Sequence, residues 1–566
     1  MAVVTAGSPA MVRARVGREG WIMRIALILL GLYLVVTVLL PLESLLRKSF
    51  FDKEGVFVGI SNYLRYFTDP ALSVAITNSL TVTAIATSIT IVIAFIYAYA
   101  IQRSRMWGRG IFRGIALVPL LAPSLLPGLS LVYMFGNQGF LNWVLGGHSI
   151  YGPIGIVIGE VFFTLPHAVM IILTALATAD QRLYEAAESL RASKLRIFFT
   201  VTLPGARYGL ISAIFVVFTL NFTDFGVPKV IGGSYNVLAT DIYKQVIGQF
   251  NFQMGAVVGM LLLIPAVISF IVDRTVQKKQ VALLSARAVP YQPKSNGLRD
   301  IGLFLFCTLV AIFVIGILIV AAYGSFITYW PYDLTFTWKN YDFNNIDTNG
   351  WGAYFNSLKM AALTAIIGTA IIFWGAYLIE KGRGFGKMRG AIQFLCMVPL
   401  AVPVLVLGLS YIFFFNHPAN PLNFLYLTMA ILVINTIAHF YTVCHLTALT
   451  ALKQMDAEFE SVSASLKIPF YKTFWRVTVP VCLPAIIDIA IYLFVNAMTT
   501  VSAVVFLYSS NTKLASISVL NMDDAGNTAS AAAMGMTIVA TSAAVRIAQG
   551  ILTHGISRRT QAWRRR

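Results

Sequence analysis

The chain has 566 residues, of which 58% are hydrophobic and only 11% are charged, and its formal net charge is +19. Soluble domains carry about 25% charged residues, so this composition excludes a soluble globular protein. Apolar runs recur along the whole chain, and each reaches the roughly 20 residues that a helix needs to cross the hydrocarbon core. Because the runs are continuous, they predict helices and not the alternating strands of a β-barrel. We therefore expect an all-α membrane protein.

About twelve spans follow in chain order, six in each half. The first span is too long for the apolar region of a signal peptide and does not indicate a cleavable one. The expected spans are 21–46, 79–101, 112–135, 153–178, 205–222 and 253–273, then 301–323, 357–380, 390–415, 424–449, 481–506 and 528–551.

Basic residues gather on one side of the membrane when twelve spans are counted. They lie in the N-terminal segment, in loops 102–113 and 381–389, in the middle segment 273–300 and in the C-terminal SRRTQAWRRR. By the positive-inside rule this side is the cytoplasm, so we expect both termini there. The positive charge thus indicates orientation in the membrane and not a nucleic-acid partner.

The two halves resemble each other in sequence. VPLLAPSLLPGLSLVY (118–133) and VPLAVPVLVLGLSYIF (398–413) share Val-Pro-Leu, a second proline and Gly-Leu-Ser in register. Six spans per half make this a parallel repeat, with modules at 1–272 and 301–566 and a cytoplasmic linker at 273–300. The prolines predict breaks in the third and ninth spans. Gly128 and Gly408 are expected to allow close helix contact there.

A charged segment between the fourth and fifth spans occurs in both halves. DQRLYEAAESLRASKLRIFFTVTLP (180–204) matches DAEFESVSASLKIPFYKTFWRVTVP (456–480). Each has the periodicity of an amphipathic helix, and the first ends in an expected Thr-Leu-Pro stop. Such a helix offers one side to the transmembrane bundle and the other to a cytosolic partner. The alternative is an interfacial helix that only anchors to lipid.

The first copy resembles the EAA loop of binding-protein-dependent ABC importer permeases. That pattern is Glu-Ala-Ala, three residues, Gly, nine residues, an aliphatic residue, any residue and Leu-Pro. Arg191 and Lys467 occupy the glycine position, where a left-handed conformation would cost about 1 kcal/mol. In the second copy Ser-Val-Ser (461–463) replaces Glu-Ala-Ala, whereas the tail is kept. The residues that the resemblance assigns to ATPase coupling are Tyr184, Glu185, Ala186, Ala187, Arg191, Leu203, Pro204, Glu460, Ser461, Lys467, Val479 and Pro480.

The resemblance covers nearly the whole chain and implies two fused permease modules in a bacterial inner membrane. It implies as partners two cytoplasmic ATPase subunits and a periplasmic solute-binding protein, with no nucleic acid. The chain itself has no G-x-x-x-x-G-K-[ST] motif; GRGFGKMRG (382–390) lacks the spacing and the Ser/Thr. We therefore predict a transport subunit that is not an enzyme, with no cofactor and no metal site.

Polar residues within apolar segments mark a candidate substrate path. They are Asn78, Asn356, Thr223, Asp224, Thr499 and Thr500. For Asn78 and Asn356, a helix N-cap at the membrane edge is an equal alternative.

Fused permeases of this size resemble ferric-iron importers and 2-aminoethylphosphonate importers. The stretch 223–259 is more similar to the phosphonate group, and its Lys229 and Lys244 would favour an anionic solute. A ferric path would be lined by carboxylates or tyrosines, and Tyr235 and Tyr243 keep that alternative open.

An ion-coupled secondary carrier is a more distant alternative, because carriers can also have two parallel sets of six spans. The common twelve-span carriers have a Gly-x-x-x-Asp-Arg-x-Gly-Arg-Arg-like loop, which QRSRMWGRG (102–110) does not match. For an integral membrane enzyme we find neither a metal-ligand cluster nor a nucleophile–base pair.

Overall fold

The computed structural model describes residues 18–283, 289, 291–382, 385–456 and 458–560. Part of the predicted basic termini, including Arg13, Arg15 and the last six residues, lies outside the described residues. The described chain is helical almost throughout, and its only named strands are β1 (Ile327–Tyr329) and β2 (Asp333–Phe336), which form an antiparallel hairpin. The all-α class is confirmed.

The first half starts with a long helical span made of α1 (Arg18–Leu34), a π-helical turn (Val35–Leu39) and α2 (Leu40–Ser49). Its central bundle contains α4, α7, α10 and α13, which pack on one another. The elements after α2 are α3 (Ser61–Thr68), α4 (Pro70–Arg103), α5 (Arg109–Ile115), α6 (Leu125–Phe135), α7 (Pro153–Ala177), α8 (Gln181–Ser189), α9 (Lys194–Ile197), α10 (Leu203–Thr223), α11 (Gly226–Ile231), α12 (Leu238–Tyr243) and α13 (Phe252–Leu283).

The second half repeats this order. Its bundle contains α16, α19, α23 and α25, the counterparts of α4, α7, α10 and α13. Its helices are α14 (Gly297–Ser325), α15 (Phe343–Ile346), α16 (Trp351–Glu380), α17 (Gly386–Ala401), α18 (Val404–Phe415), α19 (Met429–Lys453), α20 (Glu458–Ser465), α21 (Phe470–Thr473), α22 (Val479–Val481), α23 (Leu483–Thr499), α24 (Ala515–Asp524) and α25 (Thr528–Thr560).

Among the described residues, 9 helices are long and apolar enough to cross a membrane, or up to 12 if each bent helix pair is one span. These candidates correspond in order to the twelve predicted spans. The predicted breaks in the third and ninth spans are confirmed by bends of 103° before α6 and 111° between α17 and α18. A third bend, of 78° between Val481 and Leu483, was not predicted.

The predicted Thr-Leu-Pro stop after the first charged helix is wrong. Lys194–Thr223 forms one helical span of 30 residues that runs through this tripeptide. A π-helical turn at Phe198–Thr202 precedes Pro204, which lies in the first turn of α10. A proline is tolerated there because its missing N–H and its fixed φ suit the first turn of a helical segment. The fifth span therefore connects directly to the charged segment.

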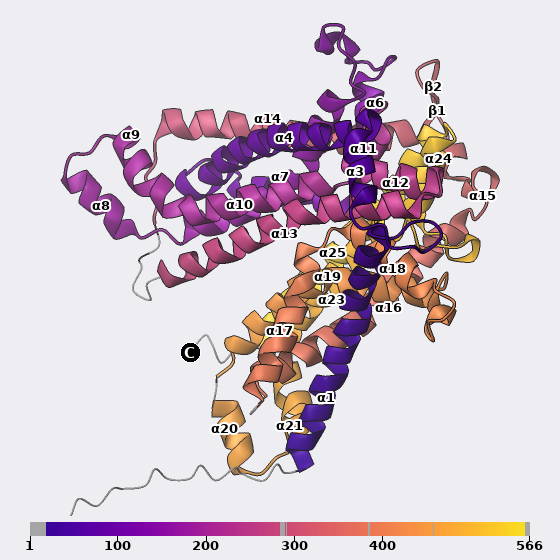
Figure 1. The fold of residues 1–566 in the computed structure, drawn as a ribbon. Coiled ribbons are helices and arrows are strands. Elements are labelled where there is room, and N and C mark those ends of the chain that lie inside the picture. The colour runs from indigo at the N-terminus through magenta and orange to yellow at the C-terminus, as the bar shows by residue number, and fades with distance from the viewer. Residues whose placement is uncertain (1–17, 284–288, 290, 383–384, 457, 561–566) are drawn as a thin grey trace, which may run out of the picture.

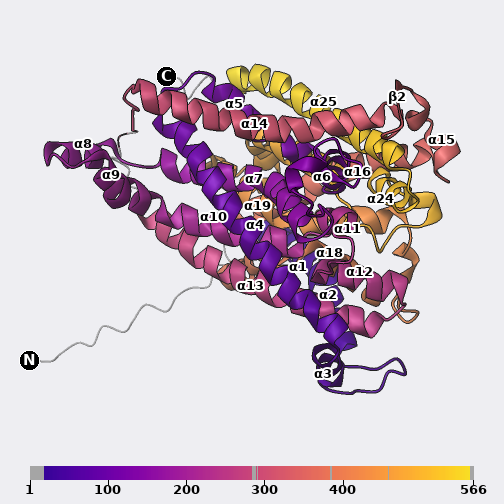
Figure 2. The ribbon, with the colours of Figure 1, turned by 90° about the horizontal axis from the view of Figure 1, so that it is seen from above.

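The first helix of each half crosses onto the other half. α1 packs against α16 and α17, and α2 packs against α18, so the first span follows the second-half bundle (Figure 1). Conversely, α14 packs against α4 and α6 of the first half as well as against α25 (Figure 2). Each half is thereby held by a helix of the other.

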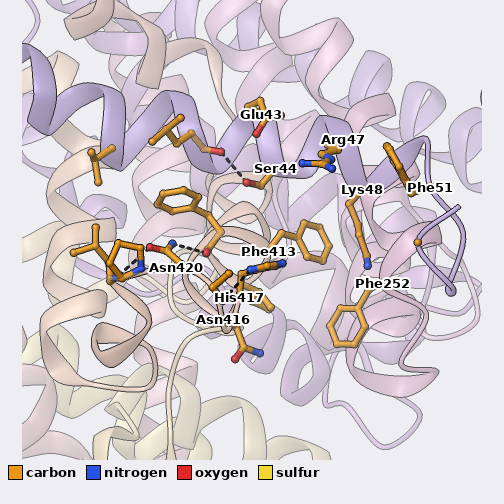
Figure 3. Close-up of a pocket in the computed structure, with 18 residues that line it drawn as sticks. Glu43, Ser44, Arg47, Lys48, Phe51, Phe252, Phe413, Asn416, His417 and Asn420 are labelled. Atoms are coloured by element: carbon orange, nitrogen blue, oxygen red, sulfur yellow. Dashed lines mark hydrogen bonds between the residues drawn. The ribbon is translucent and has the colours of Figure 1, made fainter. Parts of the chain in front are cut away.

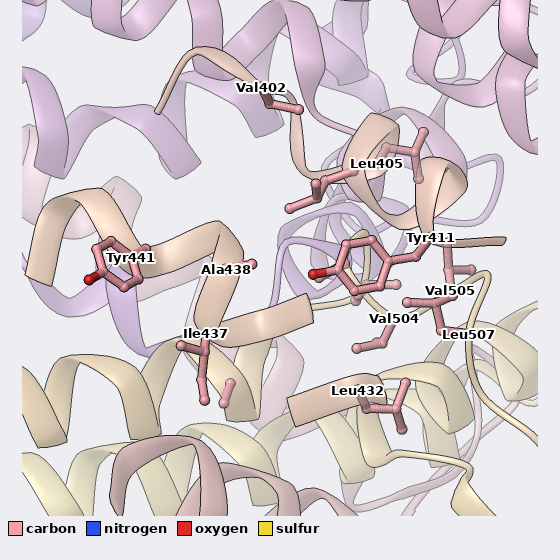
Figure 4. Packing of buried hydrophobic residues seen from close by; sticks show 14 of the residues in the cluster. Val402, Leu405, Tyr411, Leu432, Ile437, Ala438, Tyr441, Val504, Val505 and Leu507 are labelled. Carbon is pink, nitrogen blue, oxygen red and sulfur yellow. The ribbon is translucent and has the colours of Figure 1, made fainter. Parts of the chain in front are cut away.

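Buried side chains join the bent helices to the neighbouring bundle. Leu405 and Tyr411 of α18 pack near Leu432 of α19 and Val504 (Figure 4). The Tyr411 hydroxyl donates to the Thr37 carbonyl oxygen of the first span at 2.7 Å.

The two glycines of the matched Gly-Leu-Ser motifs lie at close contacts, as predicted. A Cβ on Gly128 would lie 2.8 Å from the Val230 side chain, and one on Gly408 would lie 3.0 Å from the Ala503 carbonyl oxygen. Both contacts are made to the segment that follows the fifth span of the same half. A Cβ at Gly128 would force Val230 to shift, and one at Gly408 would be tighter than an ordinary contact.

Candidate functional site

Two short amphipathic helices, α8 and α20, lie at the far ends of the two diverging bundles (Figure 1). We call them the EAA-like helices. The Asp180 side chain caps α8 by accepting from the Arg182 N–H at 3.1 Å. On α8, Tyr184 is buried toward the bundle whereas Glu185 is exposed. The predicted coupling residues lie on α8 (Tyr184, Glu185, Ala186, Ala187), at the start of α10 (Leu203, Pro204), on α20 (Glu460, Ser461), on α22 (Val479, Pro480) and in the two turns (Arg191, Lys467).

The turn after each EAA-like helix contains a residue in the left-handed region. Arg191 has φ 55° and Lys467 has φ 51°. Both occupy the position where the resembled pattern has glycine, so the turn keeps a left-handed residue in both copies although neither copy has glycine there. An L side chain there costs about 1 kcal/mol relative to glycine.

Replacing these two residues with glycine is therefore expected to stabilise the protein. Arg191→Gly and Lys467→Gly should each raise the free energy of unfolding by up to about 1 kcal/mol, because glycine adopts positive φ without a Cβ clash. Thermal unfolding of the purified chain in detergent measures this. Ala186→Gly, in the interior of α8, should instead destabilise by about 1 kcal/mol. A lowered midpoint for both turn variants would contradict the argument.

In the first half a buried arginine holds the EAA-like helix against the bundle. Arg103, at the end of α4, is 2% exposed, and its guanidinium donates to the Leu176 carbonyl oxygen at 2.8 Å. Its Cζ atom lies 5.1 Å from the ring centroid of Tyr184 and 4.2 Å from that of Tyr291. The Tyr184 hydroxyl also bonds to the Thr202 hydroxyl at 3.1 Å. The arginine thus connects the second span, α8 and the segment after α13.

In the second half an ion pair takes the same place. The Lys381 Nζ atom at the end of α16 lies 3.1 Å from the Glu460 carboxylate of α20, and the two side chains are only 12% and 19% exposed. In the repeat Lys381 corresponds to Arg103, and Glu460 corresponds to Tyr184. In the sequence, Arg103 and Lys381 indicated only the orientation of the chain in the membrane. Their matched positions at the ends of the second spans were a signal that could have identified them.

An aromatic contact joins the second span to the start of the fifth in both halves. Tyr99 and Phe198 have ring centroids 6.0 Å apart, and their counterparts Tyr377 and Phe474 are 4.8 Å apart. Trp374 adds a second ring 4.6 Å from Phe474. The start of the fifth span is therefore packed against the end of the second span in both halves.

The segment between the halves binds α8. The Gln181 N–H donates to the Val289 carbonyl oxygen at 2.9 Å, and the Gln292 N–H donates to the Gln181 side chain at 3.1 Å. Lys294 pairs with Glu188 at 2.5 Å, and this hydrogen bond and charge raise the pKa of Lys294. The linker thus holds the N-terminus and one side of the first EAA-like helix.

The opposite side of each EAA-like segment exposes apolar side chains. Leu190 is 83% exposed and its counterpart Leu466 is 66% exposed. Leu195 and Phe199, and their counterparts Tyr471 and Trp475, are also exposed. The last four belong to segments apolar enough to span the membrane, where lipid covers such side chains, whereas Leu190 and Leu466 lie outside those segments and are typical of a surface that a partner protein covers.

The predicted path residues Asn78 and Asn356 lie inside α4 and α16, so neither caps its helix. The Asn78 side-chain amide donates to the Asn236 carbonyl oxygen at 2.9 Å, and that of Asn356 donates to the Asn511 carbonyl oxygen at 3.0 Å. Both amides thus hold the loop that follows the fifth span. The neighbouring Ser79 and Ser357, which sequence analysis did not single out, accept backbone N–H groups from the same loops at 2.8 Å.

The other predicted path residues lie where the fifth spans end. Thr223 and Thr499 bond to carbonyl oxygens of their own helices, and the Thr500 carbonyl oxygen accepts from Ser516. Asp224 is 8% exposed and accepts from the Val227 N–H at 2.8 Å. These residues lie at the C-terminal ends of α10 and α23, and the path role of all six predicted residues stays a prediction.

The two halves meet at the end opposite to the EAA-like helices. The Lys229 Nζ atom of α11 lies 3.0 Å from the Asp524 carboxylate of α24. Tyr243 lies 6.4 Å, centroid to centroid, from Phe506 of the second half. Lys244 bonds to Asn236. Both lysines that suggested an anionic solute therefore already have partners.

Comparison with known proteins identifies a family to which both halves of the chain are similar. The family model described as binding-protein-dependent transport system inner membrane component matches residues 90–280 and again 381–558, more than half of the chain. A putative ferric transport system permease protein of Haemophilus influenzae is 29% identical over 84% of this chain and 76% of its own length. A ferric transport system permease protein of Actinobacillus pleuropneumoniae is 28% identical over 91% of this chain and 76% of its own length. A thiamine transport system permease protein of Haemophilus influenzae is 25% identical over 61% of this chain and 64% of its own length.

Proposed function

We propose a detailed transport role from the premise that this chain belongs to the family of binding-protein-dependent transport system inner membrane components. The family match occurs twice, once in each half, so the chain is a fused two-module permease of an ABC importer and a multi-pass inner membrane protein. This membership sets aside the secondary carrier and the membrane enzyme. The transported solute, the partner subunits and the residues that couple them are the proposal.

The EAA-like helices α8 and α20 each dock one cytoplasmic ATPase subunit in this proposal. The observation that carries this proposal is a contact found in both halves. A basic residue at the end of the second span, Arg103 or Lys381, holds each EAA-like helix. Both helices turn exposed apolar residues away from the bundle. The EAA-like helices lie apart while the opposite ends of the bundles are in contact (Figure 1), which supports an arrangement open toward the ATPase side.

A ferric ion delivered by a periplasmic binding protein is the solute that the comparisons favour. Two relatives that match most of this chain are named as ferric transport system permease proteins. The prediction of 2-aminoethylphosphonate receives no support from them. Its structural argument is also weakened, because Lys229 and Lys244 are already engaged by Asp524 and Asn236.

The solute is tested by uptake into proteoliposomes that contain this chain with its ATPase and binding protein. We expect ATP-dependent uptake of radiolabelled ferric iron and none of labelled 2-aminoethylphosphonate, since the binding protein delivers one class of solute. The control omits ATP. Uptake of the phosphonate alone would overturn the ferric assignment, while ATP-dependent uptake of either solute would support the importer role.

A further inference from the structure

A cavity of about 840 Å³ lies where the first span crosses onto the second half. One wall is α2 of the first half, and the other is the end of α18 with the chain that follows it. Figure 3 shows Arg47 and Lys48 on the α2 side and His417 and Asn420 on the second-half side. The volume falls within the roughly 300–1,000 Å³ that is typical of ligand sites.

The polar rim of this cavity is rich in cations. Arg47 and Lys48 line it together with His417, whereas the carboxylate in the lining is Glu43. Within the described ranges neither Arg47 nor Lys48 forms an ion pair with a carboxylate. The neighbouring polar groups are already engaged: Asn420 donates to the Phe414 carbonyl oxygen at 2.7 Å, and Ser44 donates to the Leu40 carbonyl oxygen at 3.0 Å. The Arg47 Cζ atom lies 5.4 Å from the centroid of the Phe51 ring, a contact that leaves the guanidinium N–H groups, like the Lys48 ammonium, available to an anion.

The remaining wall is apolar and lies within a membrane span. Val36 and Leu40 of the first span face Ile412 and Phe413 of the second half across the cavity. The first span covers Gly20–Ser49, so Arg47 and Lys48 lie at its end, where charged side chains meet the lipid headgroups. The EAA-like helices lie at the other end of the bundles.

We propose that this cavity binds an anionic phospholipid of the leaflet opposite to the EAA-like helices. Arg47 and Lys48 hold the phosphate, and the apolar wall between α2 and α18 receives the upper part of an acyl chain. A free anion would leave that apolar wall uncovered, which is why a lipid is the occupant. The bound lipid fills the junction at which the first span of one half packs on the other half.

The test measures the lipid that the full-length chain retains in detergent, by native mass spectrometry with added phosphatidylglycerol or phosphatidylcholine. The wild-type chain is expected to retain phosphatidylglycerol preferentially. Arg47→Gln with Lys48→Gln should lower that retention by roughly tenfold or more, since each cation near an anionic headgroup contributes to lipid binding. Ser44→Phe, which fills the cavity without changing its charge, should also lower it.

The matched control is Lys53→Gln with Lys339→Gln, which removes two exposed cations that do not line the cavity. This variant should retain phosphatidylglycerol like the wild type. An equal loss in the control and the Arg47/Lys48 variant would overturn the proposal, and so would unchanged retention in both the Arg47/Lys48 and Ser44→Phe variants. Displacement of the lipid by millimolar inorganic phosphate would identify a free-anion site and overturn the choice of a lipid.

Discussion

Glu185→Lys is expected to abolish ATP-driven uptake while the chain still folds and inserts into the membrane. The Glu185 carboxylate is exposed on α8 and accepts from the Gln181 side-chain amide at 3.2 Å. Reversing its charge leaves the Arg103 contact of the helix intact, removes an electrostatic attraction to Lys294 and changes the surface that we propose docks the ATPase. A charge reversal at the centre of an interface costs about 3 kcal/mol, roughly a hundredfold in affinity.

Two measurements on the same preparation separate docking from folding. ATP-dependent uptake and co-purification of the ATPase should both be lost, while the yield and elution profile of the membrane chain should stay unchanged. Glu54→Lys is the matched control, because Glu54 is an exposed carboxylate in the loop after α2. Normal uptake in Glu185→Lys, or equal loss in Glu54→Lys, would remove the docking role from this residue.

The two EAA-like helices differ in the surface that they offer to the ATPase. Glu185 of α8 is exposed, whereas the carboxylate of α20 nearest to it in the repeat, Glu460, is held by Lys381. Ser461 stands at the position that corresponds to Glu185. Both segments expose charge as well as apolar surface, since Glu458 of α20 is exposed and Leu466 is exposed after it, but only the first half has an exposed carboxylate at the position of Glu185. This asymmetry agrees with the Glu-Ala-Ala sequence being intact only in the first half.

Much of the fold could be predicted from hydropathy and internal repetition, because each depends on local sequence. The order of the twelve spans and the proline bends in the third and ninth spans belong to this class. The crossing of α1 and α14 onto the opposite halves could not be predicted, since hydropathy identifies a span but not the helices that surround it. The same holds for the linker contact of Val289 with Gln181, which depends on tertiary position.

The sequence predicted where the EAA-like helices lie in the chain, but not which residues of the bundle hold them. The loop pattern placed Tyr184 and Glu460 in the coupling segments, yet it gave no reason for the first to be aromatic and the second acidic. The structure supplies that reason: Tyr184 stacks under Arg103, whereas Glu460 pairs with Lys381. A basic residue is common to both halves, and the partner on the helix differs. Only the contacts in the structure show that the Tyr184–Arg103 contact and the Glu460–Lys381 pair hold equivalent helices in different ways.

The second large effect is expected from reversing the ion pair that holds α20. Lys381→Glu would place two carboxylates together, and Glu460→Lys would place two ammonium groups together, in a site where the pair is 12% and 19% exposed. Breaking such a partly buried pair costs about 2–3 kcal/mol, so each single variant should lose most ATP-driven uptake. The double variant restores opposite charges across the same 3.1 Å contact and should regain a large part of the uptake.

The exposed pair on the other EAA-like helix is the matched control for this exchange. Lys294 and Glu188 are 69% and 47% exposed, and reversal of an exposed pair changes stability by no more than about 1 kcal/mol. Lys294→Glu and Glu188→Lys should therefore reduce uptake only slightly. Comparing the two cycles separates the pairing energy at α20 from general damage, because a coupling energy appears only where two groups interact. If the Lys381/Glu460 double variant were no better than its single variants, the ion pair would not be what seats α20, and the aromatic contact of Tyr377 with Phe474 would have to hold it instead.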